Sequence, residues 1–262
     1  MMDQFDRAAE EIERQHGKRE RYQILDEAIR PQTLEDAYQA QLRLETLWSE
    51  GRRGSVGGYK IALTSKPIQE LCGVDHPVGG VIFENEIHQS PARMKAADFV
   101  RVGLEFEVCM KVAVDLTETG DFYNEENVRE LVAEIAPAFE FIEDRNADYS
   151  TLTGHDLVTD GGWCGGIALG ASVKDFRQLD LVNARSVLHY NDEVEETVTG
   201  AALGNPFAGL AWVANWRASL GSPVKAGHWV MTGSALKTRF PIAGDHAKYD
   251  IDGLGSVEVV FE

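Results

Sequence analysis

Two glutamates two residues apart, Glu105 and Glu107, are the first candidates for chemistry in this sequence. They lie in residues 103–110, where apolar and polar side chains alternate as in a half-buried strand. Side chains two apart on a strand share a face, so both carboxylates point to the same side. Neighbouring carboxylates raise each other's pKa unless water, a cation or a metal ion offsets the repulsion. The pattern is typical either of a solvated strand face or of a site for Mg2+ or Mn2+.

A third glutamate, Glu140, stands between Phe139 and Phe141 in a predicted strand over residues 138–144. A carboxylate in such apolar surroundings needs a partner if it is buried. Arg145 is one available partner, and a metal ion is the other.

Lys60 lies in a predicted strand over residues 57–65, and its neighbours are mostly apolar or small. A desolvated lysine has a lowered pKa and can transfer protons, although a lysine that reaches the surface is the more frequent case. Asp160 opens a glycine-rich turn over residues 160–166. This turn lacks the spacing of a phosphate-binding loop, so we predict no nucleotide site there.

The elements that must position these residues follow an α+β order with a mainly β core. Residues 1–50 are predicted to be helical, and Thr33 and Gly51 are expected to cap the second helix. We predict an N-terminal helical segment, 1–54, followed by a mixed β catalytic core, 55–262, as one functional unit. The further predicted strands are 81–83, 100–114, 186–190, 193–199, 229–231 and a final pair around 252–253, and the further predicted helices begin at Asn124, ending at Pro137, and at Asn205, ending at Gly221.

Composition excludes several classes of partner. The chain of 262 residues carries a formal charge of −18, which repels nucleic acid backbones and anionic membranes but still permits an anionic substrate near a local cation. The three cysteines form no CxxC motif, which indicates a reducing compartment. No signal-peptide pattern and no long apolar run is present, so we expect a cytoplasmic protein.

Several segments in sequence order resemble the fumarylacetoacetate hydrolase superfamily, and within it the 2-keto-4-pentenoate hydratase group. The resemblance covers the chain from about residue 33 onwards, and it depends on the order and spacing of many short motifs. These motifs are residues 58–65, 73–80, 105–107, 136–145, Asp160 with its turn, 203–206, Gly227, 232–234 and 254–255.

The resemblance implies a twisted, mostly β core of fumarylacetoacetate-hydrolase type with an N-terminal helical segment, usually in a homo-oligomer. It also implies that Glu105, Glu107 and Glu140 bind Mg2+ or Mn2+ and that Lys60 lies beside the substrate. A small 2-oxo acid is the substrate class that such a site takes. The implied activity is a metal-dependent lyase, a hydratase that adds water to a 2-hydroxy-dienoate.

Lys60 would hold the substrate carboxylate or move a proton. Asp160 is a second candidate for proton transfer, and capping of its turn is an equally good interpretation. Ser234 is expected to donate to a substrate oxygen, and the alternative interpretation is that it only shapes its loop. Thr64, on the same strand face as Lys60, is expected to contact the substrate.

Two departures from the family pattern place the reaction in question. Val78 stands where the hydratase pattern has an acidic residue, and Gly161 stands where it has Asn. Decarboxylation of a 2-oxo diacid and hydrolysis of an acylpyruvate, with His88, His155 or His228 as base, remain alternatives on the same metal site. A binding or structural protein that keeps the fold is the alternative from another class.

Overall fold

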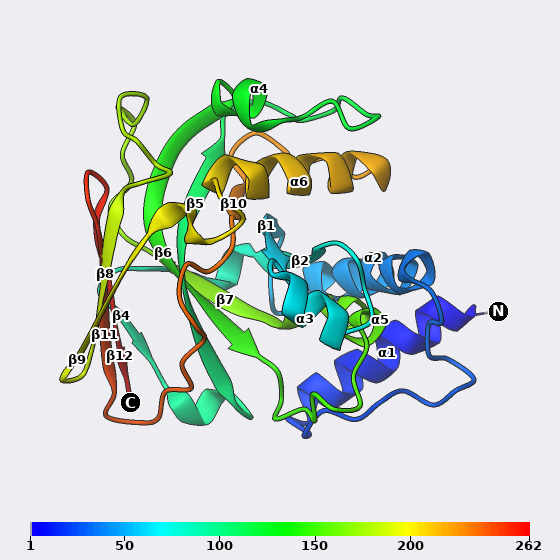
Figure 1. Ribbon diagram of the computed structural model, residues 1–262. Coiled ribbons are helices and arrows are strands. Elements are labelled where there is room, and N and C mark those ends of the chain that lie inside the picture. The colour runs from blue at the N-terminus through cyan, green and yellow to red at the C-terminus, as the bar shows by residue number, and fades with distance from the viewer. Residues whose placement is uncertain (1) are drawn as a thin grey trace.

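Two β-sheets form the centre of the molecule, and most helices lie on one side of them (Figure 1). The computed structural model describes residues 2–262, so Met1 of the predicted segment 1–54 lies outside the described residues. The larger sheet has the strand order β2-β1-β10-β5-β6-β7-β3, and the smaller one has the order β4-β12-β11-β8-β9. The strands are β1 (Val56–Ala62), β2 (Val78–Phe83), β3 (Ile87–Gln89), β4 (Ala92–Met94), β5 (Val102–Val112), β6 (Val132–Glu143), β7 (Cys164–Leu169), β8 (Arg185–Tyr190), β9 (Glu193–Val198), β10 (Trp229–Met231), β11 (His246–Ile251) and β12 (Gly255–Phe261).

In Figure 1 the smaller sheet lies at the left, while α1, α2, α3 and α5 gather at the right beside β1 and β2. A mixed core of sheets and a few helices confirms the predicted α+β class. No helix among residues 2–262 combines the length and the apolar character that a membrane crossing requires. The helices are α1 (Gln4–Gly17), α2 (Leu34–Glu50), α3 (Lys66–Leu71), α4 (Glu125–Arg129), α5 (Gly154–Thr159) and α6 (Pro206–Ser219), with 3-10 turns at Glu84–Glu86, Ala96–Asp98, Gly161–Trp163 and Thr199–Ala201.

The two N-terminal helices pack on each other and on the rest of the core. The Thr33 side chain accepts a hydrogen bond from the Asp36 N–H and so caps α2, as the sequence predicts. Tyr38 and Trp48, both on α2, are buried within this chain. They belong to the same continuous apolar cluster as the strands, so α1 and α2 help to build the core of the molecule.

The helix predicted from Asn124 to Pro137 is wrong in its second half. α4 ends at Arg129, and Val132 and Ile135, which lie inside the predicted helix, belong to β6. Ile135 lies opposite Met110 in the β5–β6 ladder. Pairing with a long neighbouring strand outweighs the weak local preference of this segment for helix.

Pro137 lies inside β6 although proline cannot donate to a ladder. The carbonyl of Pro137 accepts from the N–H of Gly170, and the N–H of Ile135 donates to the carbonyl of Val173. Both bonds reach the segment that follows β7. The side of Pro137 that lacks an N–H therefore faces this segment, where no regular ladder of hydrogen bonds has to be completed.

Candidate metal centre and active-site cavity

Pairing of β5 with β6 brings three carboxylates together. The two strands are antiparallel, and Glu105 lies directly opposite Glu140. Glu107 follows two residues after Glu105 and therefore shares its face of the sheet. One oxygen from each of the three side chains lies within 4.8 Å of the others. We call Glu105, Glu107 and Glu140 the carboxylate cluster.

The carboxylate cluster is deeply buried at two of its three members. Glu107 is 1% exposed and Glu140 is fully buried, whereas Glu105 is half-buried. Burial raises the pKa of Glu140 to about 7, and the charge of Glu105 adds to this while Lys60 opposes it. Burial, together with the charges of Glu140 and Glu105, also raises the pKa of Glu107 well above its usual range. Three carboxylates in this position need positive charge to be ionised together.

The chain supplies only part of the positive charge and hydrogen bonds that the carboxylate cluster needs. Oε2 of Glu107 accepts from the Gly233 N–H at 2.7 Å, and Oε1 of Glu105 accepts from the Thr238 hydroxyl at 2.6 Å. Oε1 of Glu107 and both carboxylate oxygens of Glu140 accept no hydrogen bond from any residue in the range 2–262. Buried polar atoms without partners are rare in proteins.

The donor set fits a hard divalent cation. Carboxylate oxygens are the ligands that Mg2+ and Mn2+ prefer, and three of the oxygens in the carboxylate cluster accept no hydrogen bond within residues 2–262. A divalent charge would also offset the mutual repulsion of the three side chains.

Lys60 is the charged neighbour of the carboxylate cluster. It lies on β1, is 2% exposed, and its Nζ is 3.0 Å from Oε1 of Glu140. The two groups form an ion pair, although the angle between them does not satisfy hydrogen-bond geometry. Burial alone would lower the pKa of Lys60, but the carboxylates of Glu140 and Glu105 raise it above its usual value. Lys60 is therefore the ion-pair partner of Glu140. The sequence suggested Arg145 or a metal ion as this partner and did not indicate Lys60.

A cavity of about 690 Å³ opens beside this cluster. Lys60, Thr64, Glu105 and Ser234, all predicted to belong to the site, line it together. The Ser234 hydroxyl donates to the carbonyl of Leu236 at 2.9 Å and accepts from the Phe106 N–H at 3.0 Å. Both bonds lie within the protein, so Ser234 holds the loop after β10 against β5.

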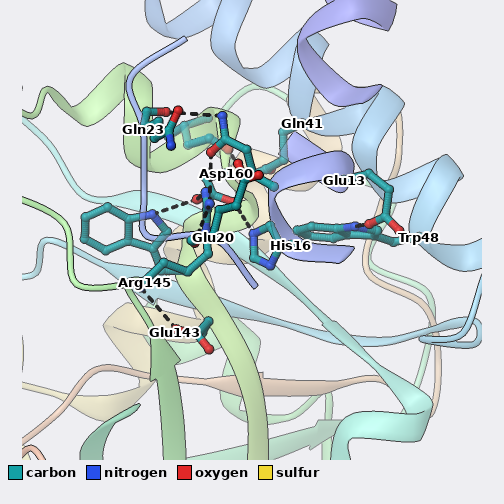
Figure 2. Close-up of polar contacts among 12 residues, drawn as sticks. Glu13, His16, Glu20, Gln23, Gln41, Trp48, Glu143, Arg145 and Asp160 are labelled. Atoms are coloured by element: carbon teal, nitrogen blue, oxygen red, sulfur yellow. Dashed lines mark hydrogen bonds and ion pairs between the residues drawn. The ribbon is translucent and has the colours of Figure 1, made fainter. Parts of the chain in front are cut away.

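Asp160, the other predicted catalytic residue, lies outside the residues that line the cavity. Its carboxylate accepts hydrogen bonds from His16 Nε2 at 2.6 Å, from Arg145 Nη2 at 2.6 Å and from Trp163 Nε1 at 3.1 Å (Figure 2). We call these four residues the Asp160 network. Because Trp163 lines the cavity, the network holds one wall of the cavity in place.

Charges inside the Asp160 network are matched. Burial would raise the pKa of Asp160, but the neighbouring His16 and Arg145 lower it below its usual value. Burial lowers the pKa of His16, and its Nδ1 faces Arg53 Nη2 at 3.3 Å. His16 is 144 residues away from Asp160, so no sequence spacing indicated this contact.

The structure accounts for the glycine at residue 161. A Cβ atom on Gly161 would lie 2.7 Å from the Trp48 ring, which excludes a larger residue at this position. A Cβ on Gly80 would lie 2.6 Å from the carbonyl oxygen of Gly161, so β2 packs directly on the glycine turn. Val78 itself is fully buried and brings no charge to the cavity.

Neither His88, His155 nor His228 is among the described residues that line the cavity. The base that acylpyruvate hydrolysis requires is therefore not supplied by any of these three histidines. This observation weakens the hydrolase alternative relative to the hydratase.

Comparisons with known proteins identify relatives of this chain. The chain is 31% identical over 232 residues to 2-hydroxyhexa-2,4-dienoate hydratase of Comamonas testosteroni, with 87% of this chain and 86% of that protein covered. It is 32% identical over 208 residues to 2-keto-4-pentenoate hydratase of Burkholderia vietnamiensis, with 79% and 78% covered. A scan against protein-family models finds no match.

Among solved structures, the fold is similar to that of 4-oxalocrotonate decarboxylase from Pseudomonas putida G7, complexed with magnesium and adipate. The TM-score is 0.90, the identity is 23%, and 100% of this chain and 99% of that chain are covered. At this identity the similarity establishes the shared fold.

Proposed function

Because this chain belongs to the 2-keto-4-pentenoate hydratase group of the fumarylacetoacetate hydrolase superfamily, we propose that it is a hydratase of 2-hydroxy-dienoates in a catabolic pathway. The observation that carries the proposal is the carboxylate cluster beside Lys60 at one end of a cavity. The names of the relatives supply the reaction type, and the free oxygens of the cluster supply a place for a divalent metal ion.

Glu105, Glu107 and Glu140 are the residues that would hold Mg2+ or Mn2+. The relative solved with magnesium supports Mg2+, and Mn2+ is proposed on the same oxygen ligands. When bound, a divalent ion supplies positive charge that stabilises negative charge on the oxygen at C2 of the substrate.

Lys60 carries the steps that the chain itself performs. Its ammonium group either holds the substrate carboxylate or delivers a proton to C5, the far end of the conjugated chain, and then takes up the proton that the C2 hydroxyl releases. The enol thereby becomes a ketone with a double bond between C3 and C4. Water adds across this bond, with hydroxide at C4 and a proton at C3, which gives a 4-hydroxy-2-oxo acid. Thr64 and Ser234 line the same cavity and are proposed to contact the substrate.

Asp160 is proposed to act through position and not through proton transfer, because three donors already occupy its carboxylate. Its part in the reaction is to orient Trp163 and the glycine turn at the cavity wall.

Decarboxylation of a 2-oxo diacid is the second candidate. The specific observation in its favour is the fold similarity, with a TM-score of 0.90, to a decarboxylase that was solved with the diacid adipate. The sequence relatives at 31% and 32% identity are hydratases, and this favours hydration.

The direct test uses purified protein, stripped of metal with a chelator and then supplied with Mg2+ or Mn2+. We expect metal-dependent loss of the ultraviolet absorbance of 2-hydroxypenta-2,4-dienoate and a product 18 mass units heavier, the mass of one water. A product lighter by carbon dioxide from a 2-oxo diacid, with no hydration of the dienoate, would instead establish the decarboxylase. No turnover and no rise in melting temperature with either metal would favour a binding protein without catalysis.

The proposal also includes a homo-oligomer in the cytoplasm. The three cysteines are free and buried, which agrees with a reducing compartment. Light scattering is expected to give a multiple of 29.0 kDa, and a monomer mass at micromolar concentration would remove the assembly from the proposal.

A further inference from the structure

Two lysines, Lys60 and Lys237, are the cations among the described residues that line the cavity. They differ in burial, because Lys60 is 2% exposed whereas Lys237 is an exposed residue. The Nζ atom of Lys60 lies 3.0 Å from Oε1 of Glu140, so a carboxylate of the chain already offsets its charge. Lys60 therefore attracts a further carboxylate, such as that of a substrate, less strongly than an unpaired lysine would.

The charge of Lys237 is not offset in this way. Arg239, two residues further along the loop, pairs with Glu195, and Glu196 pairs with Arg185, whereas Lys237 forms no ion pair within residues 2–262. Glu195 and Glu196 both line the cavity, and their partners neutralise them. Lys237 is thus the lining cation whose charge is available to a ligand.

Hydrogen bonds on both sides of Lys237 hold its backbone in place. Before it, the N–H of Ala235 donates to a β5 carbonyl at 3.0 Å. After it, the N–H of Leu104 donates to the carbonyl of Arg239 at 2.7 Å, and the N–H of Arg239 donates to the carbonyl of Leu104 at 3.0 Å. Both anchors lie on β5, which carries two members of the carboxylate cluster.

The residue after Lys237 touches the carboxylate cluster directly. The hydroxyl of Thr238 donates to Oε1 of Glu105 at 2.6 Å, and Leu236, Lys237 and Thr238 all line the cavity. The flexible four-carbon stem of a lysine lets its ammonium group reach from this backbone position over the same end of the cavity. Lys237 can therefore contact a ligand that lies beside the carboxylate cluster.

The charge of the whole chain makes a local cation important. The formal charge is −18, so an anionic substrate approaches the protein against a repulsive field. An exposed and unpaired cation at the cavity attracts such a substrate before it reaches the buried Lys60.

We propose that Lys237 binds the carboxylate of the 2-oxo acid substrate, which leaves Lys60 for proton transfer. This inference rests on the proposed function, because it takes a 2-oxo acid as the ligand. A hydrogen bond between an ammonium group and a carboxylate is charge-assisted and is stronger than one between neutral groups. Lys237 is then a substrate-binding residue.

Calorimetry with 2-oxobutanoate and Mg2+ tests binding without turnover, because this saturated acid has no diene to hydrate. Lys237→Met keeps the stem, removes the charge and should weaken binding of 2-oxobutanoate by at least about tenfold. Lys237→Arg keeps the charge and should restore most of the affinity. Added salt should weaken binding by the unaltered protein more than binding by Lys237→Met, because salt screens exposed charges.

Lys66→Met is the matched control. Lys66 is an exposed lysine at the start of α3, its Nζ donates to the carbonyl of Asp75 at 2.8 Å, and it is not among the lining residues. This variant removes the same unit of charge outside the cavity and should leave the affinity for 2-oxobutanoate unchanged.

Steady-state kinetics on 2-hydroxypenta-2,4-dienoate separate the roles of the two lysines. Lys237→Met should raise KM by at least about tenfold with a much smaller change in kcat, because a contact made equally to substrate and transition state affects KM. Lys60→Met should act mainly on kcat, because proton transfer belongs to the chemical step.

Binding of 2-oxobutanoate by Lys237→Met that equals binding by the unaltered protein overturns the inference, and it returns the substrate carboxylate to Lys60. An equal loss in Lys66→Met also overturns it, because the effect would then come from net charge alone. If the dienoate is not hydrated but 2-oxobutanoate still binds through Lys237, the proposed function fails and the inference stands. If the dienoate is hydrated with the same KM in Lys237→Met, the proposed function stands and the inference fails.

Discussion

The carboxylate cluster and the Asp160 network are both buried groups of titratable side chains, and the chain satisfies them to different degrees. In the Asp160 network each carboxylate oxygen of Asp160 accepts at least one hydrogen bond, and a guanidinium group balances the charge. In the carboxylate cluster three acidic groups share one ammonium group, and three oxygens accept no hydrogen bond within residues 2–262.

This difference separates a structural group from a functional one. Buried polar groups that find all their partners within the chain stabilise one arrangement of the backbone. Buried groups that lack partners lower stability unless a ligand completes them. We therefore expect changes in the two groups to affect different measurements, and the following predictions test this division.

The largest expected effect is a loss of catalysis when Lys60, the cation beside the carboxylate cluster, is replaced. Lys60→Met keeps the apolar stem, so the fold should persist, and kcat should fall about 10²-fold to 10⁴-fold. Affinity for Mg2+ should rise, because Glu140 loses a cation that lies 3.0 Å away. Steady-state kinetics on a dienoate and calorimetry with Mg2+ measure the two effects.

Lys111→Met is the matched control for this variant. Lys111 lies on β5, pairs with Glu134 and is not among the residues that line the cavity. Its removal should leave kcat nearly unchanged. Near-normal turnover by folded Lys60→Met would show that proton transfer belongs to another group.

The next largest expected effect is a loss of stability when the Asp160 network is broken. Asp160→Asn removes the charge that faces Arg145 and His16, and leaves Arg145 without its ion-pair partner. Breaking one partner of a buried pair typically lowers the free energy of unfolding by about 3–5 kcal/mol. Urea denaturation measures this change.

Asp175→Asn, at an exposed position, is the control and should change stability by no more than about 0.5 kcal/mol. A loss below about 1 kcal/mol in Asp160→Asn would mean that the Asp160 network is no more structural than the carboxylate cluster.

A third prediction concerns metal binding. Removing a carboxylate should lower the stability of the Asp160 network, but it should not lower the stability of the metal-free carboxylate cluster. Mg2+ at 100 times its dissociation constant should stabilise the protein by about 2.7 kcal/mol. Glu107→Gln should lose this response, yet without metal it should be at least as stable as the unaltered protein, because it removes a buried carboxylate that forms no ion pair within residues 2–262. Thermal unfolding with a chelator and with Mg2+ tests both statements.

Glu134→Gln, on β6 and outside the carboxylate cluster, should keep the response to Mg2+. A metal-free Glu107→Gln protein that is several kcal/mol less stable would place Glu107 among the structural groups.

The smallest expected effect is a dependence of stability on pH through His16. Burial lowers the pKa of His16 in the folded protein, so the unfolded chain binds the proton more readily. The contribution of His16 is fully present above the ordinary histidine pKa of about 6.5 and is lost as pH falls towards the folded value. Asp160, whose pKa is also lowered, adds a loss of the same sign only below about pH 4.

Urea denaturation between pH 5 and pH 7 should therefore show a decrease in stability at the acid side, on the order of 1 kcal/mol. His16→Gln keeps a hydrogen-bond donor but cannot be protonated, and it should flatten this dependence. An unchanged slope would show that other groups cause the loss.

Several features of the carboxylate cluster followed from sequence alone. Glu105 and Glu107 had to share a strand face, because side chains on a strand alternate with a period of two. The caps of the long helices were predictable for a similar reason, since Thr33 and Asn205 bond to N–H groups two or three residues ahead. Lys60 and Glu140 stand out in the sequence by their apolar or small neighbours. Only the family motifs linked them to Glu105 and Glu107, because no spacing in the chain indicates that proximity.

Tertiary structure decided what these residues contact. Register between β5 and β6 placed Glu140 opposite Glu105, and packing of α1 brought His16 to Asp160 across 144 residues. The helix predicted beyond Arg129 became strand, because ladder bonds with β5 exceeded its local preference. Strand alternation and helix caps depend only on residues a few positions apart, so the sequence determines them locally. Pairing of distant ionised groups depends on which elements pack together, so only the folded structure could show which cluster the chain leaves incomplete.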